Sequence, residues 1–389
     1  MYSLIVSLLI FILYGIWEYQ RHKYYRRRIP LVIHVNGTRG KSSVTRLIAA
    51  GLRAGGKRTL AKTTGSAPVI IHENGSESPI QRPFGPNIRE QIKIIRHAAN
   101  KKVDALVLEC MAVTPEYQWI SEHKIIKSDI SVITNSRLDH LDLMGPGIRN
   151  VTYSLCNTLP ENKIAFTSEI KMLPLMDKKA SSLGSKLAYV DKSDVQMEEL
   201  KNFNHIEHRE NVALALKVCT QLGIDRKIAL TGMYKAKPDI GAAEIFEVCH
   251  QEKRIYFVHS FAANDPESTG FLIENVKQIH PHLESLVMVL NTRADRMFRS
   301  RQLIEMLRDM QFNRLFLIGD QCQSIKNYAL NKGIKKEKIH VCGWITGEEL
   351  IECLDKMTEK EILLFGIGNI GGNGGRIMRY FKERNKSDV

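Results

Sequence analysis

The sequence predicts an α/β protein with two domains that follow one N-terminal membrane-spanning helix. The chain of 389 residues opens on an uncharged apolar stretch. Short apolar runs then alternate with amphipathic helical segments, as in doubly wound, mostly parallel sheets. Pro and Gly in "KAKPDIGAAE" divide two such sets. We expect an anchor at 1–20, a basic juxtamembrane linker at 21–29, one domain at 30–240 and a second, smaller one at 241–389.

The N-terminal stretch, "MYSLIVSLLIFILYGIW", has nearly the ~17–25 residues that a spanning helix needs. Aromatic residues lie near its ends and the basic run "RHKYYRRR" follows, so the positive-inside rule leaves the rest of the chain in the cytoplasm. A cleaved signal peptide is disfavoured, because there is no positive n-region and no small-x-small cleavage site. An interfacial helix is the other alternative, since the span is short.

The composition is that of a folded protein with an anionic partner. Hydrophobic residues make up 43% of the chain, and the formal net charge is +14. This charge suits a nucleotide, an acidic polymer or an anionic lipid. The seven cysteines are scattered without a C-x-x-C pair, which indicates reduced thiols without a disulfide framework or a structural zinc site.

Apolar runs and helical periodicity predict the individual elements in order. In the first domain the expected strands are "IPLVIHVNG", "VDALVLEC" and "SDISVITN", and the expected helices are "SVTRLIAAGLRAGG" and "NIREQIKIIRHAANKK". In the second domain the expected strands are "RIYFVHSF", "SLVMVLNTR", "RLFLIGDQ", "KIHVCGW" and "EILLFGIGN". Helical segments separate these five runs, which predicts a Rossmann-like α/β domain.

The loop "NGTRGKSS" lies between the first expected strand and a helix, the arrangement in which backbone N–H groups surround phosphates. Lys41 would reach the β- and γ-phosphates of ATP, and the Ser42 hydroxyl would bind Mg²⁺. Val35 stands where the standard P-loop has its first glycine. The alternative is an ordinary Gly-rich turn with a surface lysine, which the order of strand, Gly-Lys-Ser and helix disfavours. The expected ATP-binding residues here are Gly37, Thr38, Arg39, Gly40, Lys41, Ser42 and Ser43.

Polar residues also end the next two expected strands. Glu109 ends "ALVLE" and is a candidate magnesium ligand, although a solvent-facing carboxylate would read the same way. Asn135, Asp139, His140 and Asp142 follow the other strand. A histidine between two aspartates beside an ATP site is a candidate for metal binding or proton transfer.

Together these stretches resemble the Mur ligase family, with G-T-x-G-K-[ST]-[ST], a strand-ending glutamate and N-x-x-x-D-H-x-D. The family's compact G-T-x-G-K form would account for the missing glycine. Further stretches are similar to one branch, the ATP-dependent ligase subunits of poly-γ-glutamate (capsule) synthases. They are "KTTGSAP", "GPNIREQ", "ECMAVTPEYQ", "DHLDLMGP", "FAANDPEST", "NTRADR" and "FGIGNIGG". The resemblance covers nearly the whole chain and implies a Mur-ligase-like central ATPase domain.

The resemblance implies ATP and Mg²⁺ as cofactors and assigns roles to residues. Lys41, His140 and Arg293 would be catalytic, one metal would lie on Ser42 and Glu109, and a second on His140 and Glu109. The remaining implied contacts are Asn211 on the adenine side and, for substrate binding or domain closure, Thr64, Asn264, Asp265, Asp295 and Arg296. Many Mur ligases also carry a carbamylated lysine after the histidine, but this sequence has no lysine there before Lys163.

The resemblance further implies that glutamate is added to a growing poly-γ-glutamate chain through an acyl phosphate. The implied partners are glutamate, the anionic polymer, the membrane and other subunits of a synthase and export complex, without nucleic acid. The implied location is the bacterial cell membrane, with the catalytic domains in the cytoplasm.

Three alternatives compete with a ligase. The first is a nicotinamide-dependent oxidoreductase, because "GIGNIG" fits the dinucleotide fingerprint G-x-G-x-x-G. It is disfavoured, because that fingerprint needs a second strand with an acidic residue ~20 positions further on, and the chain ends before one. A membrane-tethered P-loop ATPase with a regulatory or transport role would share the ATP site, and glutamate-dependent release of ADP would separate the two. A nucleic-acid binder is suggested by charge alone.

Overall fold

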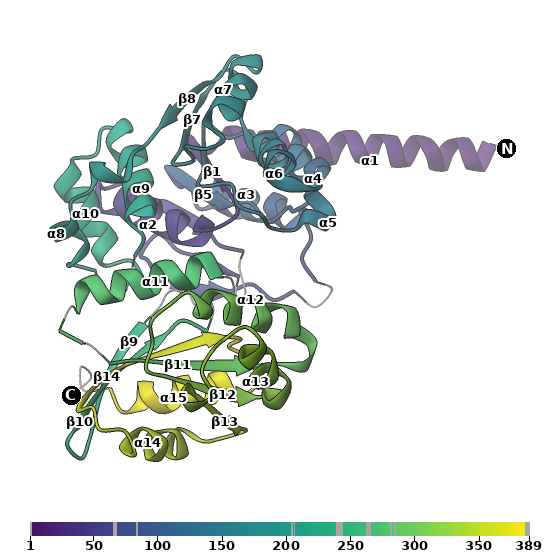
Figure 1. The fold of residues 1–389 in the computed structure, drawn as a ribbon. Coiled ribbons are helices and arrows are strands. Elements are labelled where there is room, and N and C mark those ends of the chain that lie inside the picture. Colours follow the sequence, from purple (N-terminus) through teal and green to yellow (C-terminus); the bar gives the residue numbers. More distant parts are fainter. Residues whose placement is uncertain are drawn as a thin grey trace. The chain divides into compact units, whose positions relative to one another are not determined.

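The fold is described from a computed structural model of the full chain. The described residues are 2–64, 68–82, 85–203, 205, 207–238, 244–261, 266–280, 282–283 and 285–385. The chain divides into two compact units, Met1–Asp239 and Ile240–Val389. Figure 1 colours them from purple to yellow along the sequence. Each unit is built around one sheet.

The first unit begins with a long helix, α1 (Tyr2–Arg27). Within the described residues this is the one helix that is long and apolar enough to cross a membrane. It runs through most of the predicted linker 21–29, so that segment is mainly helix. Residues before a proline disfavour the helical conformation, and accordingly α1 ends shortly before Pro30.

An eight-stranded sheet forms the centre of the first unit, in the order β4-β3-β2-β5-β1-β6-β7-β8. Its strands are β1 (Leu31–Asn36), β2 (Thr59–Lys62), β3 (Val69–Ile71), β4 (Glu77–Pro79), β5 (Ala105–Glu109), β6 (Ile130–Ile133), β7 (Ile164–Thr167) and β8 (Lys186–Tyr189). The six neighbouring strands β2, β5, β1, β6, β7 and β8 pair in parallel. The strands β3 and β4 extend the sheet beyond β2 as an antiparallel edge. The predicted strands correspond to β1, β5 and β6, which lie side by side at the centre.

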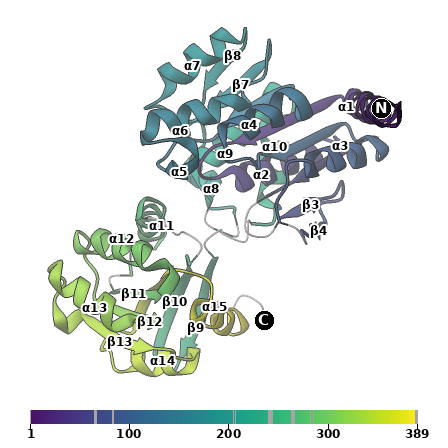
Figure 2. The ribbon, with the colours of Figure 1, turned by 90° about the vertical axis from the view of Figure 1, so that its right-hand side faces the viewer.

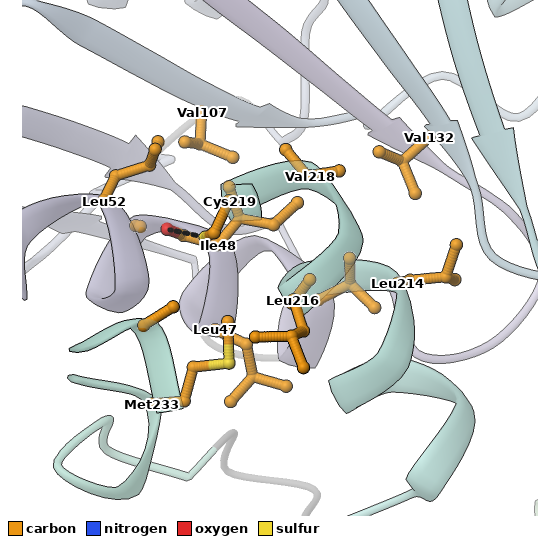
Figure 3. Packing of buried hydrophobic residues seen from close by; sticks show 14 of the residues in the cluster. Leu47, Ile48, Leu52, Val107, Val132, Leu214, Leu216, Val218, Cys219 and Met233 are labelled. Carbon is orange, nitrogen blue, oxygen red and sulfur yellow. Dashed lines mark hydrogen bonds between the residues drawn. The ribbon is translucent and has the colours of Figure 1, made fainter. Parts of the chain in front are cut away.

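Helices cover both faces of this sheet because side chains alternate along the central strands. Ile33 and Val35 face α2 (Lys41–Ala54), α9 (Arg209–Gln221) and α10 (Arg226–Tyr234). Figure 3 shows Ile48 of α2 beside Cys219 of α9, and Leu47 of α2 beside Leu216 of α9 and Met233 of α10.

The opposite face is covered by helices that connect the parallel strands. They are α3 (Glu90–Asn100), α4 (Pro115–Ile120), the π-helix η1 (Ser121–Ile126), α6 (Gly147–Leu155) and α7 (Leu173–Ser182). Val32 and Leu106 point into this layer. The remaining short helices of the unit are α5 (Leu141–Met144), η2 (Cys156–Thr158), η3 (Lys192–Asp194) and α8 (Met197–Leu200).

The second unit has a six-stranded sheet in the order β13-β12-β11-β14-β10-β9. Its strands are β9 (Glu244–His250), β10 (Lys253–His259), β11 (Ser285–Thr292), β12 (Arg314–Gly319), β13 (Ile339–Gly343) and β14 (Glu361–Gly368). All five predicted strands are present, and β9 is an additional antiparallel edge strand. The helices are α11 (Pro266–Ile279), η4 (Ala294–Arg296), α12 (Met297–Arg308), α13 (Cys322–Asn331), η5 (Lys336–Lys338), α14 (Gly347–Asp355) and α15 (Asn373–Glu383).

Candidate active site

The Gly-rich loop joins the carboxyl end of β1 to the first turn of α2. Gly37 and Gly40 have φ values of 135° and 80°, a region that side chains disfavour. Space is also limiting, because a Cβ on Gly37 would overlap Thr134 Oγ1 and one on Gly40 would lie 2.5 Å from Asn211 Oδ1. Both glycines are therefore required by backbone conformation and by close packing.

Lys41 lies directly over this loop. Its Nζ donates hydrogen bonds to the carbonyl oxygens of Gly37 at 2.7 Å and Thr38 at 3.2 Å. The first backbone N–H groups of α2 lie at the end of the same loop, and a helix N-terminus favours negative charge. The ammonium group and the helix end together create a site suited to phosphate.

The loop after β6 fixes the Gly-rich loop through Asn135. Asn135 Oδ1 accepts hydrogen bonds from Thr38 Oγ1 at 2.7 Å and from the Arg39 N–H at 3.1 Å. The Arg137 N–H donates to Thr38 Oγ1 at 3.0 Å, and the Arg39 guanidinium lies 3.8 Å from Asp139. The sequence placed Asn135 in this region but did not show that it binds the loop.

Ser42 and Glu109 form the best-defined polar pair of the site. Ser42 Oγ donates to Glu109 Oε2 at 2.9 Å, and the Thr64 N–H donates to the same oxygen at 2.7 Å. Both side chains belong to buried residues, which are 7% and 2% exposed. Hydroxyl and carboxylate oxygens are the ligands that Mg²⁺ prefers. These two predicted metal ligands thus lie together and fit the ion.

His140 is arranged differently from this pair. It has a left-handed backbone with φ 46°, its side chain is half exposed, and its Nε2 lies 3.9 Å from Asp139 Oδ1. In the parts of the chain that the structure describes, no group of three or more His, Cys, Asp and Glu side chains is suited to a metal. The predicted role of His140 in a second metal site therefore stays a prediction.

A buried lysine beside Glu109 was missed by the sequence reasoning. Lys62 ends β2, its side chain is completely buried, and its Nζ lies 2.7 Å from Glu90 Oε1. Arg82 holds the same carboxylate through two hydrogen bonds of 2.8 and 2.9 Å. Burial lowers the pKa of Lys62, while the neighbouring Glu90 opposes that shift. The available signal was that "KTTGSAP" and "GPNIREQ" contain the lysine and the glutamate.

Asn211 lies against the Gly-rich loop from the opposite side. It sits in the first turn of α9, is 4% exposed and donates from Nδ2 to Glu207 Oε1 at 3.0 Å. Burial alone would raise the pKa of Glu207, but hydrogen bonds from His205 and Asn211 bring it below its usual value. Glu207 therefore orients the amide of Asn211 as a charged acceptor.

In the second unit, charged residues gather near the loop after β14. The Arg293 guanidinium binds Asp295 through hydrogen bonds of 3.0 and 2.9 Å, and Arg296 lies 3.6 Å from the same carboxylate. A Cβ on Gly371 would lie 2.7 Å from Arg293 Nη1, which places Arg293 on this loop. The predicted Asn264 and Asp265 lie outside the described residues.

The G-x-G-x-x-G stretch does connect a strand to a helix, β14 to α15. Asn291 ties it to β11, donating from Nδ2 to the Asn369 carbonyl at 2.5 Å and the Gly371 carbonyl at 2.8 Å. Among the described residues, no strand follows α15.

A lysine-bearing loop at a helix N-terminus, next to a buried serine–glutamate pair, suits a nucleotide with its metal, and the domain that carries it is a Mur ligase middle domain. Residues 35–238 match the model of that domain. Residues 245–384 match the poly-gamma-glutamate synthase CapB C-terminal domain. The chain belongs to the CapB family of poly-γ-glutamate synthases, which confirms the resemblance seen in its motifs.

Two relatives and one solved structure illustrate this similarity. The chain is 35% identical to PGA synthase CapB of Bacillus subtilis (strain 168) over 376 residues, which are 96% of this chain and 95% of the relative. It is 36% identical to the capsule biosynthesis protein CapB of Bacillus anthracis over 366 residues, 93% of this chain and 78% of the relative. Escherichia coli FolC in complex with ADP shares the fold, with a TM-score of 0.67, 14% identity and 94% of both chains covered.

Proposed function

We propose that this chain is an ATP-dependent amide ligase that adds glutamate to a growing poly-γ-glutamate chain. The observation that carries the proposal is the Ser42–Glu109 pair beside the loop covered by Lys41. This arrangement suits a nucleoside triphosphate with its metal, and family membership supports the reaction class. An ATPase without ligase activity would leave the family's C-terminal domain without a role and is not favoured.

The phosphate groups of ATP would be held by the amides of Gly37 to Ser43 and by the ammonium group of Lys41. Mg²⁺ would be bound by Ser42 and Glu109, and a second ion by Glu109 with His140. When bound, Mg²⁺ neutralises charge on the phosphate oxygens. Asn211, held against Gly40 by close packing and oriented by Glu207, is assigned to the adenine side of the nucleotide.

The reaction needs little covalent chemistry from the protein. A carboxylate oxygen of the polymer attacks the γ-phosphorus of ATP, the bond to ADP breaks, and an acyl phosphate forms. The amine of the incoming glutamate then attacks the acyl carbon, phosphate leaves, and the amine loses a proton as the amide forms. The protein binds and orients both substrates and stabilises negative charge.

We assign the acceptor carboxylate to the region of Thr64, because the Thr64 N–H binds Glu109 and Arg82 donates to the Thr64 carbonyl at 3.3 Å. Arg293, Asp295 and Arg296 are assigned to substrate binding in the second unit. The Arg293–Asp295 pair is about half exposed, so it can exchange partners at little cost when an anionic substrate binds. Asn264 and Asp265 keep the same proposed role from the sequence alone.

The family places this chain in a poly-γ-glutamate synthase system, and α1 is its candidate membrane anchor. We propose a single-pass protein of the bacterial cell membrane, with residues 30–240 and 241–389 acting as two catalytic domains in the cytoplasm. Its partners would be glutamate, the polyanionic product and the other subunits of the synthase and export complex. Nucleic acid is not among the proposed partners.

The test is the release of ADP and phosphate by membranes that contain the full chain, with ATP and Mg²⁺. Reactions with L-glutamate, D-glutamate and no amino acid are compared, and hydroxylamine traps an acyl phosphate. We expect glutamate-dependent turnover, and Lys41→Ala should lower it by roughly 10²–10³-fold because it removes a charge from the phosphate site. Lys336→Ala, at an exposed lysine of the second unit, is the matched control. ATP turnover that requires Lys41 but does not depend on glutamate would exclude the ligase function and favour the alternative of an ATPase without ligase activity.

A further inference from the structure

The junction of α1 with the first unit is rigid. His22 Nε2 donates to the Ile125 carbonyl at 2.8 Å. Arg26 donates to the carbonyls of Ile126 at 2.7 Å and Lys127 at 2.8 Å, and to Asp129 Oδ2 at 2.8 Å. Because several bonds tie the last turns of α1 to η1 and the residues after it, the helix leaves the unit without a hinge.

The folded part of the first unit also contacts α1 at the point where its apolar segment ends. That segment ends at Trp17, and the next residue, Glu18, pairs with Arg89 just before α3 at 3.0 Å. If α1 crosses the bilayer, the start of α3 therefore lies at the level of the headgroups. Figure 2 faces the N-terminal end of α1 and shows α3, α4, α6 and α7 turned toward the viewer. With α1 across a bilayer, this helical layer is the side of the unit that faces it.

Aromatic side chains are exposed on the same layer. Tyr117 and Trp119 of α4 and Tyr153 of α6 are 51%, 41% and 49% exposed. The Lys124 ammonium lies 4.9 Å from the centroid of a Trp119 ring. Tyrosine and tryptophan with lysine nearby are the residues that proteins place at membrane interfaces.

A basic cavity of about 470 Å³ opens between α6 and α7. Arg149, Lys171, Lys178 and Lys179 contribute its charge and Tyr153 its aromatic wall, and no Asp or Glu lines it. In the described part of the chain, none of these four cations has an ion pair with a carboxylate. A second basic cavity of this unit, beside Arg46, differs because Glu73 and Glu77 line it as well.

We propose that the α6–α7 cavity binds the phosphate headgroup of an anionic membrane lipid and fixes the first unit on the bilayer surface. Four cations without carboxylate partners suit a phosphate, and the negative cytoplasmic leaflet attracts such clusters. Poly-γ-glutamate would also be attracted by charge. The lipid is favoured because, with α1 across the bilayer, the hydrogen bonds of His22 and Arg26 would keep this layer next to the membrane surface. The inference rests on the membrane placement proposed above, not on the ligase reaction.

The test uses the full chain in nanodiscs made of phosphatidylcholine alone or with phosphatidylglycerol. An amine-reactive reagent labels lysines, and mass spectrometry measures the rate at each one. We expect labelling of Lys171, Lys178 and Lys179 to slow about tenfold with phosphatidylglycerol, and high salt to reverse this by screening. Lys335 and Lys336, exposed in the second unit, are internal controls whose rates should not change.

Arg149→Gln should weaken the protection of the three lysines, whereas Lys336→Gln removes the same charge elsewhere and should leave it intact. Equal labelling in both bilayers overturns the proposal. Protection by poly-γ-glutamate in phosphatidylcholine discs, without protection by phosphatidylglycerol, would make the cavity a polymer site instead. A chain that does not enter the discs overturns the membrane placement and this inference together. Glutamate ligation in the same discs is measured separately, so its loss with protection intact would count against the proposed reaction alone.

Discussion

The two candidate substrate regions of this protein are built in different ways. Around Glu109, Ser42 and the Thr64 N–H donate hydrogen bonds to the buried carboxylate, and the buried Lys62 is close enough to interact with it electrostatically. Around Arg293, the charges are about half exposed and paired with a neighbour two residues away. Buried pairs are costly to break, while exposed ones rearrange at little cost. The first region is thus preorganised, and the second is adaptable.

The largest expected effect of this difference is at Glu109. Glu109→Gln keeps an oxygen for the Thr64 N–H but removes the charge that would hold Mg²⁺. We expect kcat to fall by roughly 10²-fold and the Mg²⁺ concentration for half-maximal rate to rise, because metal stabilisation of the transferring phosphoryl group is lost. Steady-state kinetics across Mg²⁺ concentrations measure both. Unchanged Mg²⁺ dependence would remove Glu109 from the metal site.

Lys62 tests whether the preorganised region depends on its buried cation. Lys62→Met keeps the volume but leaves Glu90 with Arg82 as its remaining cation partner. We expect the free energy of unfolding to fall by about 3 kcal/mol, since removing one partner of a buried pair is strongly destabilising. Urea unfolding of the detergent-solubilised chain measures it. The double variant Lys62→Met with Glu90→Gln should recover part of the loss, and no recovery would show that the pair is not coupled.

A third prediction concerns pH and the strand that leads into the Gly-rich loop. His34 of β1 is buried with its Nδ1 2.8 Å from Glu122 Oε2. Burial alone would lower the pKa of His34, but Cys110 and Glu122 raise it to about 9. Because the folded value lies above the unfolded value of about 6.5, this contribution is complete below pH 6.5 and is lost as pH rises through about 9.

The Tm of the full chain should therefore decline between these two pH values. His34→Gln should flatten that decline, whereas His250→Gln, at a half-exposed histidine of the second unit, should not. An equally steep decline in His34→Gln would assign the alkaline loss of stability to other groups.

The smallest effect is expected in the adaptable region. Asp295→Asn removes the carboxylate that binds Arg293, but both side chains are about half exposed. The free energy of unfolding should change by less than about 1 kcal/mol. The KM for glutamate should change several-fold if the pair meets the substrate. A stability loss comparable to that of Lys62→Met would contradict the distinction between the two regions.

The sequence predicted the preorganised region in part because its central strands are long apolar runs with polar ends. The neighbouring strands β1, β5 and β6 place the Gly-rich loop, Glu109 and Asn135 at their carboxyl ends, and all three were expected there. The ligase class and the family were predicted from the motifs and are confirmed by the relatives.

Other features depend on partners that are distant in sequence. β2 has only four residues, "TLAK", and a lysine at the end of so short a strand is expected to be exposed. Lys62 is buried because Glu90 pairs with it and with Arg82. β9, missing from the predicted strands, forms an antiparallel edge by pairing with β10. The basic residues at 21–29 read as a linker because charge suggests solvent, whereas Arg26 in fact binds backbone carbonyls of the folded unit.

The π-helix η1 connects α1 to the strand that precedes the Gly-rich loop. Its Ile125 and Ile126 carbonyls accept hydrogen bonds from His22 and Arg26 of α1, while its Glu122 binds His34 of β1. β1 continues directly into the Gly-rich loop. If α1 spans a membrane, a force that tilts it would be transmitted through η1 to the strand that leads into the Gly-rich loop.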